Sequence, residues 1–156
     1  MNNTDKLEEW SNMKVGEIIY DSDCNGWSQD VFINTVENRS NCYFIAFTDE
    51  NYVFGGFSPS KEKLEDTFLF TFNENGIMNK VKKYNIIDKK NGGVKLSKCT
   101  HCLFSFHCGI SIYPTGERET FASNSIGMYY KDAYKRCITG TSKSFDVERI
   151  VVIQMI

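Results

Sequence analysis

Residues Asn41–Phe57 read NCYFIAFTDENYVFGGF and have the pattern of a β-hairpin. Cys42–Thr48 is a run of aromatic and β-branched residues, residues 49–51 (DEN) supply turn chemistry, and Tyr52–Phe57 forms the returning arm. Apolar side chains occupy both alternating sets of positions in the first run. The pattern therefore predicts a central strand that is covered on both faces.

Two features around this hairpin extend the prediction. Gly55 and Gly56 lack side chains and permit a bulge or a close backbone approach. The block Thr67–Phe72 reads TFLFTF and places three phenylalanines at even positions on one face. Neither block contains a residue type suited to catalysis, so both are interpreted as scaffold.

The composition is that of one globular, β-rich domain. The chain has 156 residues, 41% of them hydrophobic and 14% aromatic, with 12 Phe, 8 Tyr and only two Pro. A chain of this length can bury a hydrophobic core without disulfide bonds or a structural metal ion. We therefore expect a single domain over residues 1–156, with an N-terminal helix at about 4–13 and a core at about 14–155.

A second helix is expected between two of the strands. Ser28 is a plausible N-cap for a helix that runs to about Glu37. Its predicted buried side carries Val31, Phe32, Thr35 and Val36.

The order of the remaining segments predicts the architecture. Strands are expected at Val15–Tyr20, in a lysine-rich arm at Ile77–Ile87, as a pair within Leu103–Tyr113, up to Phe121, and at Phe145–Met155. One helical turn is expected after Phe121. Seven to nine strands that mostly follow one another in sequence favour antiparallel pairing. The predicted class is mainly β (α+β), a two-sheet antiparallel β-sandwich flanked by about two helices.

Charge and hydropathy exclude several classes. The formal net charge of −2 argues against a globally basic nucleic-acid binder. No stretch approaches 18 consecutive apolar residues, so no transmembrane segment is expected. The polar N-terminus MNNTDKLEEW does not have the pattern of a signal peptide, and the six cysteines are best interpreted as reduced thiols of a cytoplasmic protein.

The sharpest local pattern is a group of cysteines and histidines. Cys99 and Cys102 form a Cys-x-x-Cys pair, and His107 and Cys108 follow closely. These four residues are weak candidates for a tetrahedral zinc site. An extended Leu103–Cys108 would hold Cys102 and Cys108 roughly 20 Å apart, so the favoured interpretation is a structural strand, with no metal and no other cofactor.

A redox-active pair of Cys99 and Cys102 is the alternative, because Lys98 and His101 could lower a thiol pKa. No serine lies in a G-x-S-x-G elbow, and no glycine-rich phosphate loop is present. We therefore expect no enzymatic activity.

Two charged segments have a functional and a structural interpretation. Residues 80–98 contain seven lysines and one acid, Asp88. A solvated arm that protects an edge strand is favoured over an acidic protein partner or nucleic acid. Asp21, Asp23 and Asn25 resemble part of a calcium loop, but Phe32 stands where the bidentate glutamate would be, so a capping turn is favoured.

Taken in order, several short motifs resemble the TLDc domain of the eukaryotic oxidation-resistance proteins. They are residues 18–22 (IIYDS), 25–28 (NGWS), 53–57 (VFGGF), 67–72 (TFLFTF), 109–113 (GISIY) and 145–152 (FDVERIVV). The resemblance implies a β-sandwich flanked by helices and a role in oxidative-stress protection. It also implies a protein partner, with the peripheral sector of the vacuolar proton-pumping ATPase as the first candidate.

Overall fold

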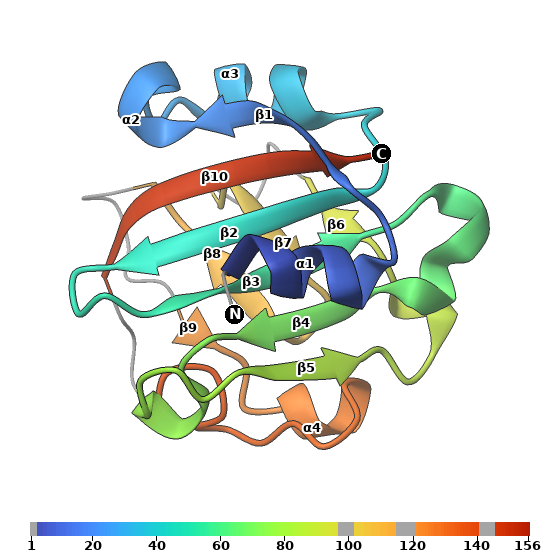
Figure 1. Ribbon diagram of the computed structural model, residues 1–156, viewed down its shortest axis with the longest axis vertical. Helices are drawn as coiled ribbons and strands as arrows, with labels where there is room; N and C mark the ends of the chain where they lie inside the picture. Colours follow the sequence, from blue (N-terminus) through green and yellow to red (C-terminus); the bar gives the residue numbers. More distant parts are fainter. Residues whose placement is uncertain (1–2, 97–101, 115–120, 141–145) are drawn as a thin grey trace.

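The computed structural model describes residues 3–96, 102–114, 121–140 and 146–156. Two antiparallel sheets pack against each other, one of six strands and one of four (Figure 1). The predicted two-sheet sandwich is therefore confirmed, since every strand pair in the described part of the chain is antiparallel.

The larger sheet has the strand order β1-β10-β2-β3-β4-β5. Its strands are β1 (Val15–Asp21), β2 (Cys42–Thr48), β3 (Val53–Ser58), β4 (Phe68–Thr71), β5 (Lys82–Asn85) and β10 (Val147–Met155). Only β10 is out of sequence order, because it is inserted between β1 and β2. The two ends of the chain therefore meet in this sheet, and neither can be removed without exposing a neighbour.

The smaller sheet has the order β6-β7-β8-β9 and lies behind the first in the view of Figure 1. Its strands are short: β6 (Val94–Lys95), β7 (Phe104–Phe106), β8 (Ile110–Ile112) and β9 (Phe121–Ala122). The strand pair predicted within residues 103–113 is the β7–β8 hairpin, with Phe104 opposite Ile112.

The main hydrophobic core fills the space between the sheets. Phe44 of β2 packs against Phe104 and Phe106 of β7, with ring centroids 5.1 and 6.1 Å apart. A Cβ at Gly56 would lie 2.5 Å from two ring carbons of Phe106, so only glycine leaves room for this ring. The register of β2 and β3 is regular, and the glycine therefore serves close packing of the two sheets and not a bulge.

The second face of the larger sheet is covered by the N-terminal helix α1 (Asn3–Ser11), which lies across β2, β3 and β4 in Figure 1. Its Trp10 contacts the three phenylalanines of the Thr67–Phe72 block at 5.8–6.1 Å between ring centroids. The buried Tyr43 Oη donates a hydrogen bond to the carbonyl oxygen of Leu7 at 2.7 Å. As predicted, β2 is thus buried on both faces.

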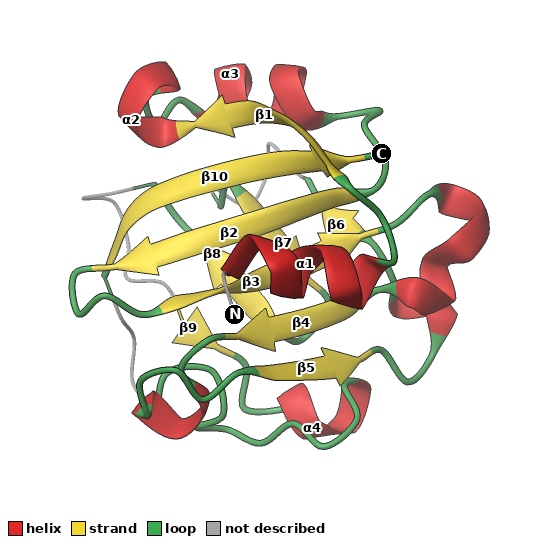
Figure 2. Cartoon of the chain, in the orientation of Figure 1, coloured by secondary structure: helices red, strands yellow, loops and turns green. Residues whose placement is uncertain are grey.

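The described residues form four α-helices, and two of these are longer than four residues (Figure 2). They are α1 and α3 (Gln29–Val36), and they correspond to the two predicted helices. Ser28 caps α3, its Oγ accepting from the backbone N–H of Val31. The buried side differs from the prediction: Phe32, Ile33 and Val36 are buried, whereas Val31 is 46% exposed. The spacing i, i+1, i+4 is the same, displaced by one residue, because α3 lies against β1 at a different rotation about its axis.

The other helical segments are short. They are α2 (Ser22–Asn25), α4 (Ile126–Tyr129) and the 3₁₀ turns η1 (Lys61–Asp66), η2 (Glu74–Gly76) and η3 (Lys89–Asn91). None of the helices formed by the described residues is long and apolar enough to cross a membrane.

The lysine-rich arm predicted over Ile77–Ile87 is a strand only at β5. Asn75 and Asn79 have φ angles of 55° and 63°, left-handed values that end an extended chain. As predicted, β5 is an edge strand of the larger sheet and carries Lys82 and Lys83.

Candidate functional site

The structure separates Cys102 from two other candidate zinc ligands, His107 and Cys108. Cys102 precedes β7 and is 6% exposed, while its carbonyl oxygen accepts a hydrogen bond from the side chain of Gln29 at 2.7 Å. His107 and Cys108 lie beyond the other end of β7, in the turn that leads to β8. Cys99 lies outside the described residues. Among those residues, no three His, Cys, Asp or Glu side chains are grouped so that they could hold a metal ion.

His107 instead forms part of a surface depression of about 360 Å³. Its ring packs edge-on against Tyr129 of α4, with 4.7 Å between ring centroids. The depression is lined by residues from three segments: Ile87, Asp88, Lys90, Asn91, His107, Met128 and Tyr129. The backbone N–H of Ile87 donates to the carbonyl oxygen of Tyr129 at 2.9 Å, which fixes α4 beside the end of β5.

Two of the exposed side chains of this site are large and apolar. Ile87 is 60% exposed and Met128 is 73% exposed, although both line the same depression. We call this site the Ile87–Met128 surface and define it by the seven residues that line the depression. Large apolar side chains gathered around a hollow are typical of a surface that contacts another molecule.

The charges of the Ile87–Met128 surface are largely satisfied internally. The pKa of Asp88 is lowered, first by the hydrogen bond that its carboxylate accepts from the backbone N–H of Lys90 and then by the charge of that lysine. The Lys90 Nζ lies 3.4 Å from the same carboxylate. The other lysine of η3, Lys89, is exposed to solvent.

The partial calcium-loop motif is used for packing. Asp21 caps α2, because its Oδ1 accepts from the backbone N–H of Asp23 at 3.0 Å. The same carboxylate binds Arg149 of β10 through two hydrogen bonds of 3.0 and 2.6 Å. Arg149 is the main cause of the lowered pKa of Asp21. The capping interpretation is confirmed, and the carboxylate ties β1 and α2 to the last strand.

A buried polar group lies beneath η2. Tyr84 Oη donates to Glu74 Oε2 at 2.7 Å, and Lys80 Nζ lies 3.3 Å from Glu74 Oε1. Burial is the first cause of the raised pKa of both Tyr84 and Cys137, a neighbouring thiol that is 0% exposed. A fully buried protonated thiol is not a nucleophile, so this group stabilises the fold.

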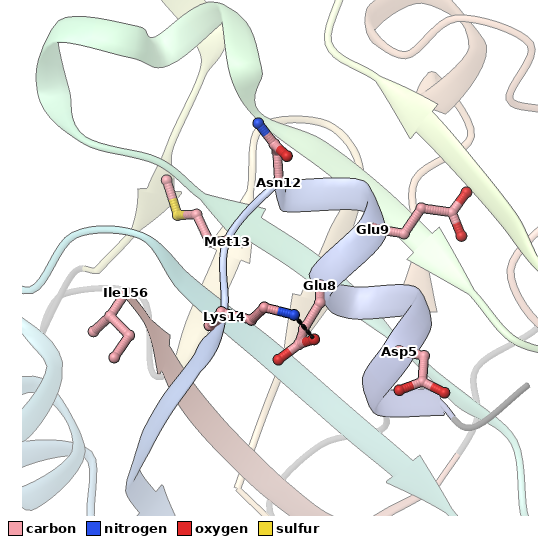
Figure 3. A pocket seen from close by; sticks show the side chains of 7 residues that line it. All are labelled: Asp5, Glu8, Glu9, Asn12, Met13, Lys14 and Ile156. Carbon is pink, nitrogen blue, oxygen red and sulfur yellow. Dashed lines mark hydrogen bonds and ion pairs between the residues drawn. The ribbon is translucent and has the colours of Figure 1, made fainter.

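A second depression, of about 400 Å³, lies beside the end of α1 and is drawn in Figure 3. Glu8 accepts a hydrogen bond from the backbone N–H of Val15 at 3.0 Å and pairs with Lys14 at 3.1 Å. These two contacts lower the pKa of Glu8. Glu9 pairs with Lys6 at 3.0 Å. Glu8 therefore fastens α1 to the first residue of β1, whereas the pair of Glu9 and Lys6 lies within the helix.

Sequence reasoning named His107 only as a weak candidate for a zinc ligand and missed the surface to which it belongs. One signal was available, since Ile86 and Ile87 are adjacent and an extended chain must turn one of them outward. Ile86 is 8% exposed, and Ile87 is the one that faces solvent. Met128 gave no comparable signal, because the segment after Phe121 has no clear periodicity.

Comparison with protein-family models and with curated protein sequences found no match to this chain. The TLDc resemblance therefore stays a prediction that is based on the short motifs alone.

Proposed function

We propose that this protein is a non-catalytic interaction module of the TLDc type that acts in oxidative-stress protection in the cytoplasm. The observation that supports a binding role is the Ile87–Met128 surface, where apolar side chains from two segments border one hollow. The predicted partner is a protein, with the peripheral sector of the vacuolar proton-pumping ATPase as the first candidate by resemblance.

The setting of the surface indicates the chemistry of the partner. Its residues 87–91 belong to the lysine-rich segment 80–98, whose one acid, Asp88, is already paired with Lys90. Lys82 and Lys83 of β5 and Lys89 of η3 add positive charge along the same edge. A partner that presents apolar side chains with an acidic border complements this arrangement. Burial of Ile87 and Met128 would supply the affinity, and the lysines would favour association.

The experiment is an affinity capture from the cytosol, with mass spectrometry of the bound proteins. Wild-type protein is compared with a double variant, Ile87→Ser with Met128→Ser, which removes the apolar side chains from the surface without touching the core. A matched control is Ile18→Ser, because Ile18 is 59% exposed and lies on β1, at the opposite edge of the same sheet.

Wild type and the Ile18 variant are expected to recover peripheral ATPase subunits, and the double variant at least tenfold less. If the double variant recovers as much of these subunits as wild type does, the Ile87–Met128 surface is not the binding site. Failure of wild type to recover these subunits would refute the proposed partner.

A thiol-redox or zinc-stabilised protein that uses Cys99 and Cys102 is the alternative. It predicts about one zinc per chain after purification, or a disulfide between the two cysteines after peroxide treatment. Elemental analysis and peptide mapping separate it from the interaction module, which requires neither.

A further inference from the structure

The β7–β8 turn places one accessible thiol at the edge of the core. Cys108 has a left-handed φ of 47° in this turn and is half-buried. Of the five cysteines in the described residues, Cys42, Cys102 and Cys137 are buried, and Cys24 is exposed. Burial raises the pKa of Cys42 to about 11, which keeps that thiol protonated.

A buried hydroxyl without a partner lies next to Cys108. Tyr130 is 0% exposed, and its Oη is one of two buried side-chain oxygens in the described residues that have no hydrogen-bond partner. A Cβ at Gly109 would lie 2.9 Å from Cε2 and 3.2 Å from Cζ of Tyr130. The hydroxyl end of the ring therefore contacts the residue that follows Cys108.

The causes of the raised pKa of Tyr130 also indicate that its hydroxyl lies near Cys108. The pKa of Tyr130 is raised, first by burial and then by the negative charge that Cys108 carries when ionised. The other unpartnered oxygen, Oγ1 of Thr139, lies two residues after the fully buried Cys137. Cys108 is thus the one cysteine of the described residues for which partial exposure and a free buried hydroxyl donor coincide.

We propose that Cys108 is a site of oxidation by hydrogen peroxide, and that the Tyr130 hydroxyl holds the resulting sulfenate. The Cys108 sulfur, as thiolate, attacks one peroxide oxygen, so that an S–O bond forms as the O–O bond breaks. Sulfur loses two electrons, and the departing hydroxide takes the proton of the new S–OH group, which leaves one water molecule and the sulfenate. The sulfenate oxygen then accepts the hydrogen bond that Tyr130 Oη does not donate in the reduced protein.

The unpaired hydroxyl has a physical consequence that sets this site apart. A buried donor without an acceptor destabilises the reduced fold, whereas a hydrogen bond to a charged oxygen is among the stronger ones. Oxidation of Cys108 would give the Tyr130 hydroxyl a hydrogen-bond acceptor. The sulfenate is therefore stabilised relative to one formed in open solvent. At the lower end of such bonds, the expected effect is about tenfold in lifetime.

The test traps sulfenate with dimedone after a pulse of peroxide, in the full chain, and maps the labelled cysteines by mass spectrometry. Labelling is repeated at increasing delay to give a lifetime for each cysteine. The variant Tyr130→Phe removes the hydroxyl alone, and Tyr129→Phe removes the neighbouring phenol as a matched control. Because Tyr130→Phe removes a buried hydroxyl that has no partner among the described residues, this variant is expected to fold with an unfolding midpoint no lower than that of wild type.

In wild type, the Cys108 sulfenate is expected to persist about tenfold longer than the one at the exposed Cys24. Tyr130→Phe should abolish this difference, and Tyr129→Phe should preserve it. The proposal is overturned if Cys108 is not labelled, or if Cys24 persists as long in wild type. Equal lifetimes in wild type and Tyr130→Phe would likewise overturn it. If a tyrosine variant fails to fold, the comparison of sulfenate lifetimes at Cys108 and Cys24 in wild type still tests the proposal. This chemistry does not depend on the partner proposed for the Ile87–Met128 surface.

Discussion

The contact between Gly56 and Phe106 is a direct test of how the two sheets pack. The substitution Gly56→Ala adds a Cβ that would lie 2.5 Å from Cε2 and Cζ of the Phe106 ring and 2.8 Å from Cδ2. Ordinary contacts between carbon atoms are about 3.5–4.0 Å, so the ring must retreat by about 1 Å. Phe106 is 1% exposed and contacts both Phe44 and Phe104, which leaves it no free space.

The magnitude follows from two opposing effects. Overpacking of a filled core costs about 1–3 kcal/mol. Replacement of glycine by alanine recovers about 0.4–1 kcal/mol through the lower entropy of the unfolded chain. We therefore expect Gly56→Ala to lower the free energy of unfolding by about 1–2 kcal/mol, and the melting temperature by about 2–8 °C for a chain of this size.

The assay is a double-mutant cycle with urea unfolding. Phe106→Leu removes the ring carbons that meet the new Cβ, so it should relieve the effect of Gly56→Ala and give a favourable coupling of at least 0.5 kcal/mol. Gly55→Ala is the matched control, because its Cβ would meet the backbone carbonyl of Phe44 on the opposite side of β3. Phe106→Leu should leave the cost of that variant unchanged. A neutral Gly56→Ala, or equal coupling for both glycines, would refute the packing described here.

Three further predictions concern polar contacts. Tyr84→Phe removes the partly buried hydrogen bond to Glu74, and urea unfolding should show a loss of stability of about 1.5–3 kcal/mol. A loss below about 0.5 kcal/mol would contradict a hydrogen bond to a charged acceptor. The pKa of Asp21 lies below its ordinary value of 3.8, so its bond to Arg149 stabilises the fold fully above that value and is lost as the pH falls through the lower folded pKa. The difference in unfolding free energy between wild type and Asp21→Asn should thus be constant at pH 5–7 and shrink below about pH 4. Urea unfolding at each pH measures this difference. A difference that grows as the pH falls would contradict the stabilising role of the ionised Asp21. Ser28→Ala removes the N-cap of α3 and should cost about 1 kcal/mol, with Ser28→Asp restoring stability.

Much of the fold was predictable because local patterns and tertiary packing agree. The alternation of Cys42–Thr48 predicted a strand buried on both faces, and Tyr43 and Phe44 indeed face opposite sides of the larger sheet. Ser28 and the residues after it predicted a capped helix. The rotation of that helix was wrong by one residue, since Val31 and Ile33 are both apolar and only the packing of α3 decides between them.

The candidate site was less predictable. Cys102 and His107 are close in sequence, but β7 lies between them and its extension separates them. Ile87 and Met128 are 41 positions apart in the chain and line one depression only because Ile87 pairs with the backbone of α4. Likewise, no sequence signal linked Asp21 with Arg149.

The sequence by itself determined most of the strands, the two longer helices and the antiparallel class, because alternation and capping act between residues that are near neighbours in the chain. It did not predict the two-residue strand β6. Only the tertiary structure decided that β10 enters the sheet between β1 and β2, and that the Tyr130 hydroxyl lies beside the turn that contains Cys108. Such long-range contacts depend on which faces pack together, and a pattern that sets the direction of each side chain does not specify its partner.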